Sequence, residues 1–213
     1  NVSKTYRSDG QEVLAIDEID LKIKNKEFAT ILGPSGCGKS TLLRIVAGLI
    51  KPTKGIVRLD ENVITRPGQD RGMVFQSYTL FPWLTVRENI RLAVQSRGNQ
   101  NFRLFRSAHS LKQVEEKTSS ILEEVGLGDI ASHKAGAVSY GYQRSLEVGI
   151  ALATDPLLLL LDEPTSGMPP DDARRMMALI KKISKGLTIL LIEHHMAVVM
   201  SISDKITVLH QGS

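Results

Sequence analysis

The stretch GPSGCGKST at residues 33–41 constrains the fold of this chain more than any other part of the sequence. It follows the run EFATILG, which is typical of a buried strand, and it precedes a helical pattern from Lys39 to about Ala47 that ends at Gly48. The stretch matches the pattern G-x-x-x-x-G-K-[ST] between a strand and a helix. Because such a loop turns successive backbone N–H groups toward one point, it predicts an α/β fold with a phosphate site.

The residue types in this loop suit a nucleotide. The glycines let the backbone curl, Lys39 carries a charge that neutralises β- and γ-phosphates, and the Ser40 hydroxyl can bind Mg²⁺. Thiols at helix N-termini are often reactive, so we expect alkylation of Cys37 to block nucleotide binding. The predicted nucleotide-binding residues here are Gly33, Pro34, Ser35, Gly36, Cys37, Gly38, Lys39, Ser40 and Thr41.

A second constraint comes from the run LLLLLDEP at residues 157–164. A continuous apolar run that ends in acids is typical of a parallel strand buried on both faces. Its carboxyl end carries Asp162 and Glu163, at the edge where open α/β sheets bind ligands. We expect Asp162 to bind the metal and Glu163 to orient the attacking water, which favours ATP hydrolysis over binding alone.

The rest of the chain alternates β-rich runs with helical patterns. We expect one domain over residues 1–213, with an α/β core at about 1–81 and 154–213 and an inserted helical subdomain at about 82–153. Further strands are expected at GIVRLDENVI, DRGMVFQ, LTILLIEHH and KITVLHQG. Helices are expected at LKQVEEKTSSILEEVGL, at DDARRMMALIKKIS, and from a Ser139 cap to Thr154. The methionines at positions 176, 177, 196 and 200 are expected to pack against the sheet.

The composition excludes several classes of protein. The chain is 42% hydrophobic and 23% charged, which is typical of a soluble globular protein with a sizeable core. Its net charge of +4 includes no block of like charges, which argues against a nucleic-acid partner. No apolar run is long enough to span a membrane, and a single cysteine fits a reducing cytoplasm. The ends are abrupt, and we expect both ends of a longer protein to be missing.

The two motifs, with SYGYQR between them, make the chain resemble the ATP-binding cassette (ABC) ATPases over essentially its whole length. The resemblance implies a P-loop NTPase (RecA-like) core with an inserted helical subdomain and an N-terminal antiparallel β part. It also implies ATP and Mg²⁺ as cofactors. By the same likeness, Tyr6 matches the aromatic that stacks on adenine, Gln76 the glutamine that reaches the metal, and His194 the histidine near the γ-phosphate.

Ser139, Tyr140 and Gly141 fall on the family's signature loop, which grips the γ-phosphate held by a second subunit. The commonest signature reads L-S-G-G-Q-x-Q-R, whereas residues 138–145 read VSYGYQRS. Tyr142, Ser145, Ile150 and Pro169 also depart from the usual residues. The second half, with LEVGIAL and DEPTSGM, resembles branched-chain amino-acid importers, whereas RGMVFQSYTLFPWLTVRENI resembles nitrate, sulfonate or taurine importers. We hypothesise a mixture of two branches that changes near residues 98–102.

The resemblance implies the ATP-hydrolysing subunit of an importer for a small polar solute, either an amino acid or a nitrate- or sulfonate-type anion. The implied partners are an integral membrane permease, a second ABC ATPase subunit and, indirectly, a solute-binding protein, at the cytoplasmic face of the membrane. The expected permease dock is formed by Phe81, Pro82, Trp83 and Leu84, although these residues could instead cover the subdomain's own core. A non-transport ABC ATPase and an ATP-switched module with little turnover are the alternatives.

Overall fold

A five-stranded parallel sheet forms the centre of the structure, a computed structural model that describes residues 1–213 except 9–10, 77–79, 98–107, 195 and 211–213. The strand order is β6-β7-β8-β3-β9, so neighbours in the sheet are mostly distant in sequence. The strands are β3 (Phe28–Leu32), β6 (Arg71–Val74), β7 (Leu158–Asp162), β8 (Thr188–Ile192) and β9 (Lys205–Val208). The strands expected from EFATILG, DRGMVFQ, LLLLLDEP, LTILLIEHH and KITVLHQG are therefore confirmed.

The central strands are buried on both faces, and their side chains alternate between two parts of the core. Leu158 and Leu160 pack in the cluster that includes α1 (Lys39–Val46). Leu159 and Leu161 pack on the opposite side, in the cluster that includes α4 (Tyr140–Leu152) and α5 (Pro170–Ile183). Because strand side chains alternate with a period of two, a continuous apolar run is what this two-sided environment requires.

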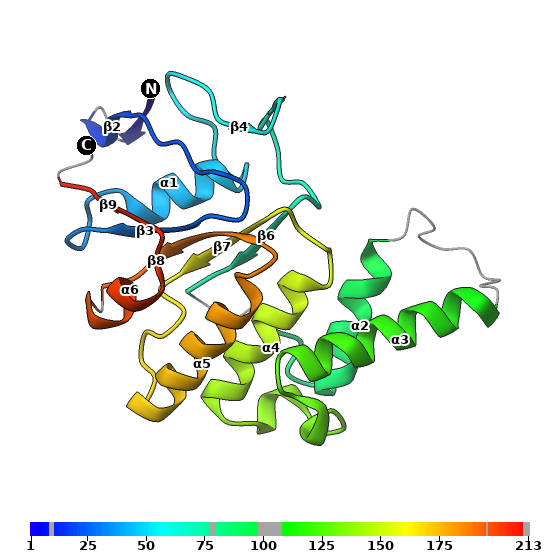
Figure 1. The fold of residues 1–213 in the computed structure, drawn as a ribbon. Coiled ribbons are helices and arrows are strands. Elements are labelled where there is room, and N and C mark those ends of the chain that lie inside the picture. Colours follow the sequence, from blue (N-terminus) through cyan, green and yellow to red (C-terminus); the bar gives the residue numbers. More distant parts are fainter. Residues whose placement is uncertain (9–10, 77–79, 98–107, 195, 211–213) are drawn as a thin grey trace.

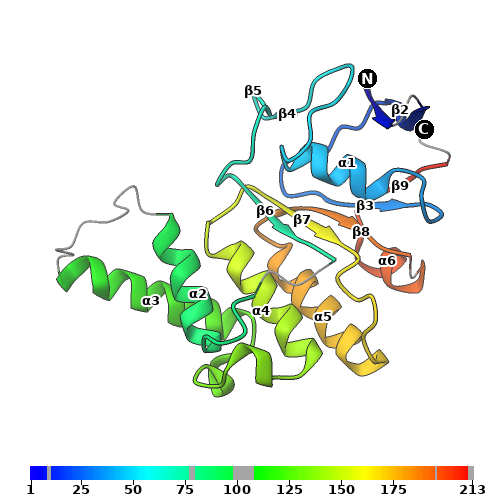
Figure 2. The same ribbon diagram turned by 180° about the vertical axis from the view of Figure 1, so that it is seen from behind.

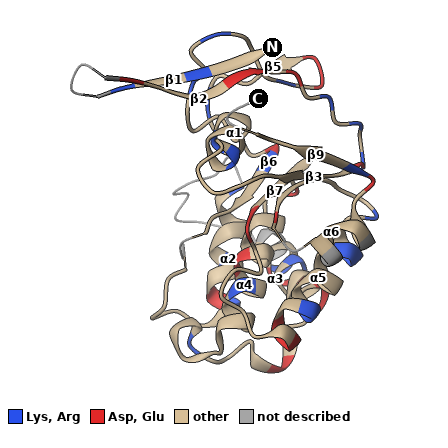
Figure 3. Ribbon diagram, turned by 90° about the vertical axis from the view of Figure 1, so that its left-hand side faces the viewer, with Lys and Arg blue, Asp and Glu red and all other residues tan. Residues whose placement is uncertain are grey.

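The two faces of the sheet carry different layers (Figures 1 and 2). Helix α1 covers one face together with the antiparallel pair β1 (Val2–Ser8) and β2 (Gln11–Ile19). The run GIVRLDENVI forms a short hairpin of β4 (Arg58–Leu59) and β5 (Asn62–Val63), which confirms the strand expected there, and this hairpin lies near the same layer (Figure 1). Helices α4, α5 and α6 (Met196–Ile202) lie on the other side. Figure 3 shows basic and acidic residues interspersed along the ribbon in both layers.

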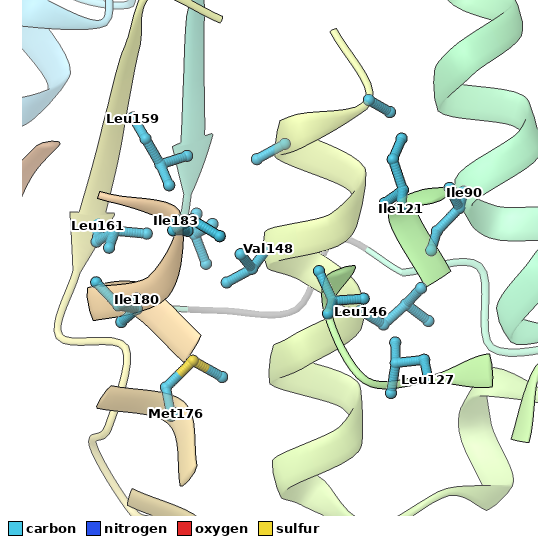
Figure 4. Packing of buried hydrophobic residues seen from close by; sticks show 14 of the residues in the cluster. Ile90, Ile121, Leu127, Leu146, Val148, Leu159, Leu161, Met176, Ile180 and Ile183 are labelled. Carbon is cyan, nitrogen blue, oxygen red and sulfur yellow. The ribbon is translucent and has the colours of Figure 1, made fainter. Parts of the chain in front are cut away.

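A helical region extends from one edge of the sheet. It contains α2 (Val86–Ser96), α3 (Ala108–Glu124) and the short 3₁₀ turns at Gly128–Ile130 and Ala135–Ala137. Thr85 and Glu88 form a capping box that starts α2. Figure 4 shows that Leu146 and Val148 of α4 lie between Ile90 and Ile121 of this region and Ile180 and Ile183 of α5, so the core continues across α4. The division at residues 82–153 stays a prediction.

Some local expectations were wrong. Helix α4 ends at Leu152 and not at Thr154: residues 153–154 form a turn, and Asp155, with a positive φ of 45° before Pro156, stops any continuation. Ser139 occupies the N-cap position, but its side chain makes no capping hydrogen bond.

The methionines divide into two pairs. Met176 and Met177 are buried on α5, as expected. Met196 and Met200 are exposed, because the short helix α6 turns Val199 and Ile202 inward and leaves these methionines outside. The expectation that they pack against the sheet was wrong. Among the described residues, no helix combines the length and the hydropathy that crossing a bilayer requires.

Candidate active site

The segments that carry the candidate site residues leave the sheet at one edge. In the register of the sheet, Ile192 of β8 lies opposite Ile31 of β3 on one side and opposite Asp162 of β7 on the other. Val74 of β6 lies opposite Leu161. The chain therefore leaves these four strands at the same level, into residues 33–38, 75–76, 162–163 and 193–194. This edge, at the carboxyl ends of parallel strands, is where open α/β sheets bind ligands.

The loop at residues 33–41 has a backbone shape that needs glycine. Gly33, Gly36 and Gly38 have φ angles of 154°, 81° and 94°. A Cβ on Gly38 would lie 2.2 Å from the carbonyl oxygen of Ala15, and one on Gly33 would lie 2.4 Å from that of Leu209. Both the conformation and the close backbone approach therefore exclude larger residues at positions 33 and 38.

Lys39 lies inside this loop. Only 8% of the residue is exposed, and its Nζ donates hydrogen bonds to the carbonyl oxygens of Gly33 (2.8 Å) and Pro34 (2.7 Å). It is also 3.8 Å from the Sγ of the buried Cys37. A lysine ammonium has three donors on a flexible stem, so it can exchange these carbonyls for phosphate oxygens at the same loop.

Ser40 and Asp162 meet in front of the loop. The Ser40 hydroxyl donates to Asp162 Oδ1 over 3.1 Å, and Asp162 is only 3% exposed. Burial raises the pKa of the Asp162 carboxyl, and the charge of Glu163 acts in the same direction, against the Ser40 hydrogen bond and the positive charges of Lys39 and Arg44. A hydroxyl and a carboxylate oxygen are ligands that Mg²⁺ prefers, so this donor pair fits that ion.

Gln76 and Glu163 are in contact, although they are far apart in sequence. Gln76 Nε2 donates to Glu163 Oε2 over 3.3 Å. The backbone of Glu163 has a φ of 49°, in the left-handed region, and its N–H donates to the carbonyl of Ile192 (3.0 Å). The structure thus aims the Glu163 side chain by an unusual backbone turn and by the amide of Gln76.

His194 follows β8 at the same edge. Its side chain is 52% exposed, with Nδ1 3.8 Å from Glu193 Oε2. Glu193 itself is fully buried, and it accepts hydrogen bonds from the backbone N–H of His194 (2.9 Å) and from the N–H and hydroxyl of Thr165. Glu193 thereby joins the end of β8 to the turn after Glu163. Sequence reasoning missed this residue, although an acid at the end of a buried strand was an available signal.

Tyr6 lies on the antiparallel strand pair and not on the sheet edge. It pairs with Val13, is 40% exposed, and has Lys4 Nζ 5.1 Å from its ring centroid. The same strand pair contacts the phosphate loop, because Ala15 of β2 lies against Gly38. The pair therefore presents an accessible aromatic ring on an element that borders the loop.

Ser139, Tyr140 and Gly141 lie at the start of α4, on the sheet face opposite to α1 (Figure 1). A Cβ on Gly141 would lie 2.9 Å from Cγ of Asp172 on α5. Within one chain, residues 139–141 and the helix α1 that follows the loop at residues 33–38 thus lie on different faces of the sheet. Sequence reasoning did not single out Arg144 and Glu147, a buried ion pair on the same helix.

The segment at residues 81–84 is firmly held but exposes its aromatic side chains. Phe81 is 46% exposed and Trp83 is 66% exposed, with ring centroids 5.7 Å apart. The buried Asn89 accepts from the N–H of Phe81 (3.0 Å) and donates to the carbonyls of Phe81 (3.1 Å) and Thr85 (2.9 Å). The segment is also held by the N–H of Gly136, which donates a hydrogen bond to the carbonyl of Pro82.

The family model and the similar proteins all concern ATP-binding proteins of transporters. Residues 16–166 match the family described as ABC transporter. The chain is 38% identical over 214 residues to the high-affinity branched-chain amino acid transport ATP-binding protein BraF of Pseudomonas aeruginosa, covering 94% of this chain and 84% of BraF. It is 40% identical over 220 residues to the bicarbonate transport ATP-binding protein CmpC of Synechococcus elongatus, covering all of this chain but only 31% of CmpC.

A solved structure shares the fold. The chain superposes with a TM-score of 0.83 and 31% identity on the ATP-binding cassette MJ0796, in a dimeric post-hydrolysis state bound to ADP and Pi. This match covers 100% of the chain and 93% of the solved one. The α/β core expected from the sequence is therefore confirmed. The hypothesised change between two branches near residues 98–102 falls largely outside the described residues and stays a hypothesis.

Proposed function

The chain belongs to the ABC transporter family, and on that premise we propose that it is the ATP-hydrolysing subunit of an importer for a small polar solute. The observation that carries this proposal is the meeting of Lys39, the Ser40–Asp162 pair and the Gln76–Glu163 pair at one edge of the sheet. The relatives named for transport of branched-chain amino acids and bicarbonate support a role in transport, and relatives named for nitrate import and methionine import support its inward direction. We propose an amino acid or a nitrate- or sulfonate-type anion as the solute.

In this proposal the loop at residues 33–41 binds the phosphates of ATP. Its N–H groups and the start of α1 face the anion, and Lys39 moves from the Gly33 and Pro34 carbonyls to the phosphate oxygens. The oxygens of Ser40, Asp162 and Gln76 would hold Mg²⁺, which supplies charge neutralisation on the β- and γ-phosphates. Tyr6 would stack on the adenine, with its exposed ring on the strand pair that borders the loop.

Hydrolysis requires a water aligned with the γ-phosphate. Glu163 is the residue that we assign to orient this water and to accept its proton, because its carboxylate is aimed by Gln76 and by its own backbone turn. His194 would donate a hydrogen bond to the γ-phosphate from the end of β8. Its backbone is fixed by the buried Glu193, and its imidazole is half exposed at the end of β8.

The working unit that we propose contains two ATPase subunits. Ser139, Tyr140 and Gly141 lie on the other face of the sheet from α1, so one chain presents its signature and its phosphate loop to different surroundings. In a dimer, the start of α4 from one subunit would complete the ATP site of the other. The dimeric state of the cassette MJ0796 supports this arrangement.

The proposed partner on the membrane side is a permease, with a solute-binding protein acting indirectly. Phe81 and Trp83 form an exposed aromatic pair on a segment held by buried Asn89, which suits a docking surface that must transmit force. The chain would then lie at the cytoplasmic face of the membrane. Replacing Trp83 with alanine should lower solute uptake by the reconstituted transporter at least about tenfold, whereas phenylalanine should retain most of it.

Substitution of Glu163 tests the enzymatic part of the proposal. In the full-length protein, Glu163→Gln should lower phosphate release at least about 100-fold while ATP still binds, because only the proton acceptor is lost. Glu61→Gln, an exposed acid in the β4–β5 turn, is the matched control and should leave the rate unchanged. Equal rates for wild type and Glu163→Gln would remove Glu163 from this role. A wild type without phosphate release would favour the ATP-switched module.

A further inference from the structure

Tyr140, Arg144 and Glu147 form a buried charged cluster on one side of α4, called the α4 cluster below. Arg144 is 2% exposed and Glu147 is 3% exposed, and Arg144 Nη1 lies 2.7 Å from Glu147 Oε2. Burial alone would lower the pKa of Arg144, but hydrogen bonds to Tyr140 and Glu147 raise it, so the guanidinium stays charged. A buried ion pair adds little net stability compared with apolar residues, which suggests that this one serves another purpose.

Arg144 holds the backbone of the segment that carries Gln76. Its Nη1 donates to the carbonyl oxygen of Phe75 (2.8 Å), and its Nη2 donates to that of Gln76 (2.6 Å). A planar guanidinium with a rigid set of donors can fix two neighbouring carbonyls at once. Gln76 is the residue whose side chain contacts Glu163, so Arg144 acts on Glu163 through one intermediate residue.

Tyr140 holds the turn that follows Glu163 in the chain. Its hydroxyl donates to the carbonyl of Ser166 (2.8 Å) and accepts from Arg144 Nε (3.3 Å) and Nη2 (3.1 Å). Ser166 in turn donates its N–H to the carbonyl of Glu163 (3.1 Å). One tyrosine and one arginine on α4 thus reach both the segment of Gln76 and the turn that follows Glu163.

We propose that the α4 cluster positions Gln76 and Glu163, and so ties the signature loop, which acts on the ATP site of the partner subunit, to the catalytic residues of its own site. This inference rests on the proposed function. Tyr140 stands where the commonest signature has glycine, and its hydroxyl contacts both Arg144 and Ser166, which glycine cannot do. Tyr140, Arg144 and Glu147 are positioning residues, because they act through Gln76 and the Ser166 turn.

The test separates turnover from binding. In the full-length protein, Tyr140→Phe removes only the hydroxyl. Arg144→Lys keeps the positive charge but loses the planar guanidinium that donates to two carbonyls at once. Each should lower kcat about tenfold through misplacement of Glu163, with KM for ATP changed by less than about twofold. The Hill coefficient for ATP should fall toward one, because the two ATP sites are then less coupled. Arg58→Lys, the same change at an exposed position, is the matched control.

A double variant tests whether the residues act as one unit. Tyr140→Phe combined with Arg144→Lys should lower kcat by less than the product of the two single effects, because both changes disturb the Tyr140–Arg144 contact that the two residues share. If both single variants keep kcat within about twofold of wild type, or change KM alone, the inference is overturned. The proposed function would stand in that case, provided that wild type hydrolyses ATP and Glu163→Gln does not. A wild type that fails to hydrolyse ATP overturns both.

Discussion

Two helix starts in this molecule are built by different means. Helix α1 follows a loop whose glycines at 33, 36 and 38 take positive φ angles, and in which Gly33 lies against the backbone of Leu209 and Gly38 against that of Ala15 in β2. Helix α4 has Gly141 in its first turn, outside the left-handed region, and its N-cap residue Ser139 makes no side-chain capping bond. Its start is held instead by side chains: Tyr140 on Ser166, and Gln143 on the carbonyls of Ala135 and Val138.

The starts of α1 and α4 therefore tolerate amino-acid substitutions differently. A loop whose shape depends on backbone conformation needs particular glycines, because a Cβ at position 33 or 38 would collide with a backbone carbonyl and all three positions take a positive φ. A loop held by side chains can replace its residues as long as another hydrogen-bond pattern closes around it. This explains how the signature can carry Tyr140, Tyr142 and Ser145 and still present the start of a helix.

The largest effect is expected from Asp162, the acid that faces the first of these loops. Asp162→Asn should abolish phosphate release, because the carboxylate beside Ser40 is lost. It should also raise Tm at neutral pH by about 3 °C, the shift that about 1 kcal/mol gives in a chain of this size. Burial of an ionised carboxyl costs stability, and asparagine removes that charge while its oxygen still accepts from Ser40.

The pH dependence of this gain has a definite sign. The pKa of Asp162 is raised in the folded state, so the native protein binds this proton more readily than the unfolded chain does. The contribution of Asp162 to stability is therefore greatest at acidic pH and is lost as pH rises through the folded pKa. The Tm difference between Asp162→Asn and wild type should shrink on acidification, as measured by thermal unfolding. Asp129→Asn, at an exposed site, should show no difference; a constant gain for Asp162→Asn would contradict the assignment.

The next largest effect is expected from Gly38→Ala, which changes the loop before α1, whose shape depends on its backbone conformation. Position 38 has a φ of 94° and its Cβ would meet the carbonyl of Ala15 at 2.2 Å. Strain of this kind costs about 1–3 kcal/mol, so ATP affinity should fall at least about tenfold. Titration with a fluorescent ATP analogue measures this change. Binding within about twofold of wild type would show that the loop is less rigid than its geometry indicates.

A smaller and different effect is expected from Gly141→Ala, the matched change in the first turn of α4, the helix start that is held by side chains. The new methyl group would meet the Asp172 carboxyl group, which is a side chain that can move. ATP affinity of the single chain should stay within about twofold, while hydrolysis by the dimer falls several-fold, about 1 kcal/mol in the barrier. Equal losses of affinity for Gly38→Ala and Gly141→Ala would erase the contrast between the loops.

The smallest effect is expected from Cys37→Ala. The Sγ is buried and 3.8 Å from Lys39 Nζ, but neither the loop conformation nor a phosphate contact requires sulfur. ATP affinity should change by less than about twofold, with at most about 1 kcal/mol lost from stability. Because Cys37 is the chain's only cysteine, iodoacetamide should reduce ATP binding to wild type and leave Cys37→Ala unaffected. Equal inhibition of both would place the reactive group elsewhere.

The same contrast explains which parts of the molecule the sequence could predict. The turn between β3 and α1 and the buried strand at 158–162 were predictable, because glycine spacing and apolar runs reflect local backbone geometry. Arg144 was not, because its partners Phe75 and Gln76 are distant in sequence and meet it only in the fold. Ser139 was expected to cap its helix from residue type alone, but tertiary contacts hold that helix start instead.

The backbone of Glu163 sets two selections against each other. At a φ of 49°, glycine and asparagine have a lower conformational energy than glutamate, but neither can accept a proton from water. In a library of all substitutions at position 163, sorted by cellular abundance, we expect glycine and asparagine to rank at or above glutamate. Sorted by solute uptake, the same library should retain only glutamate. Ranking variants by expression would therefore enrich inactive transporters at this position.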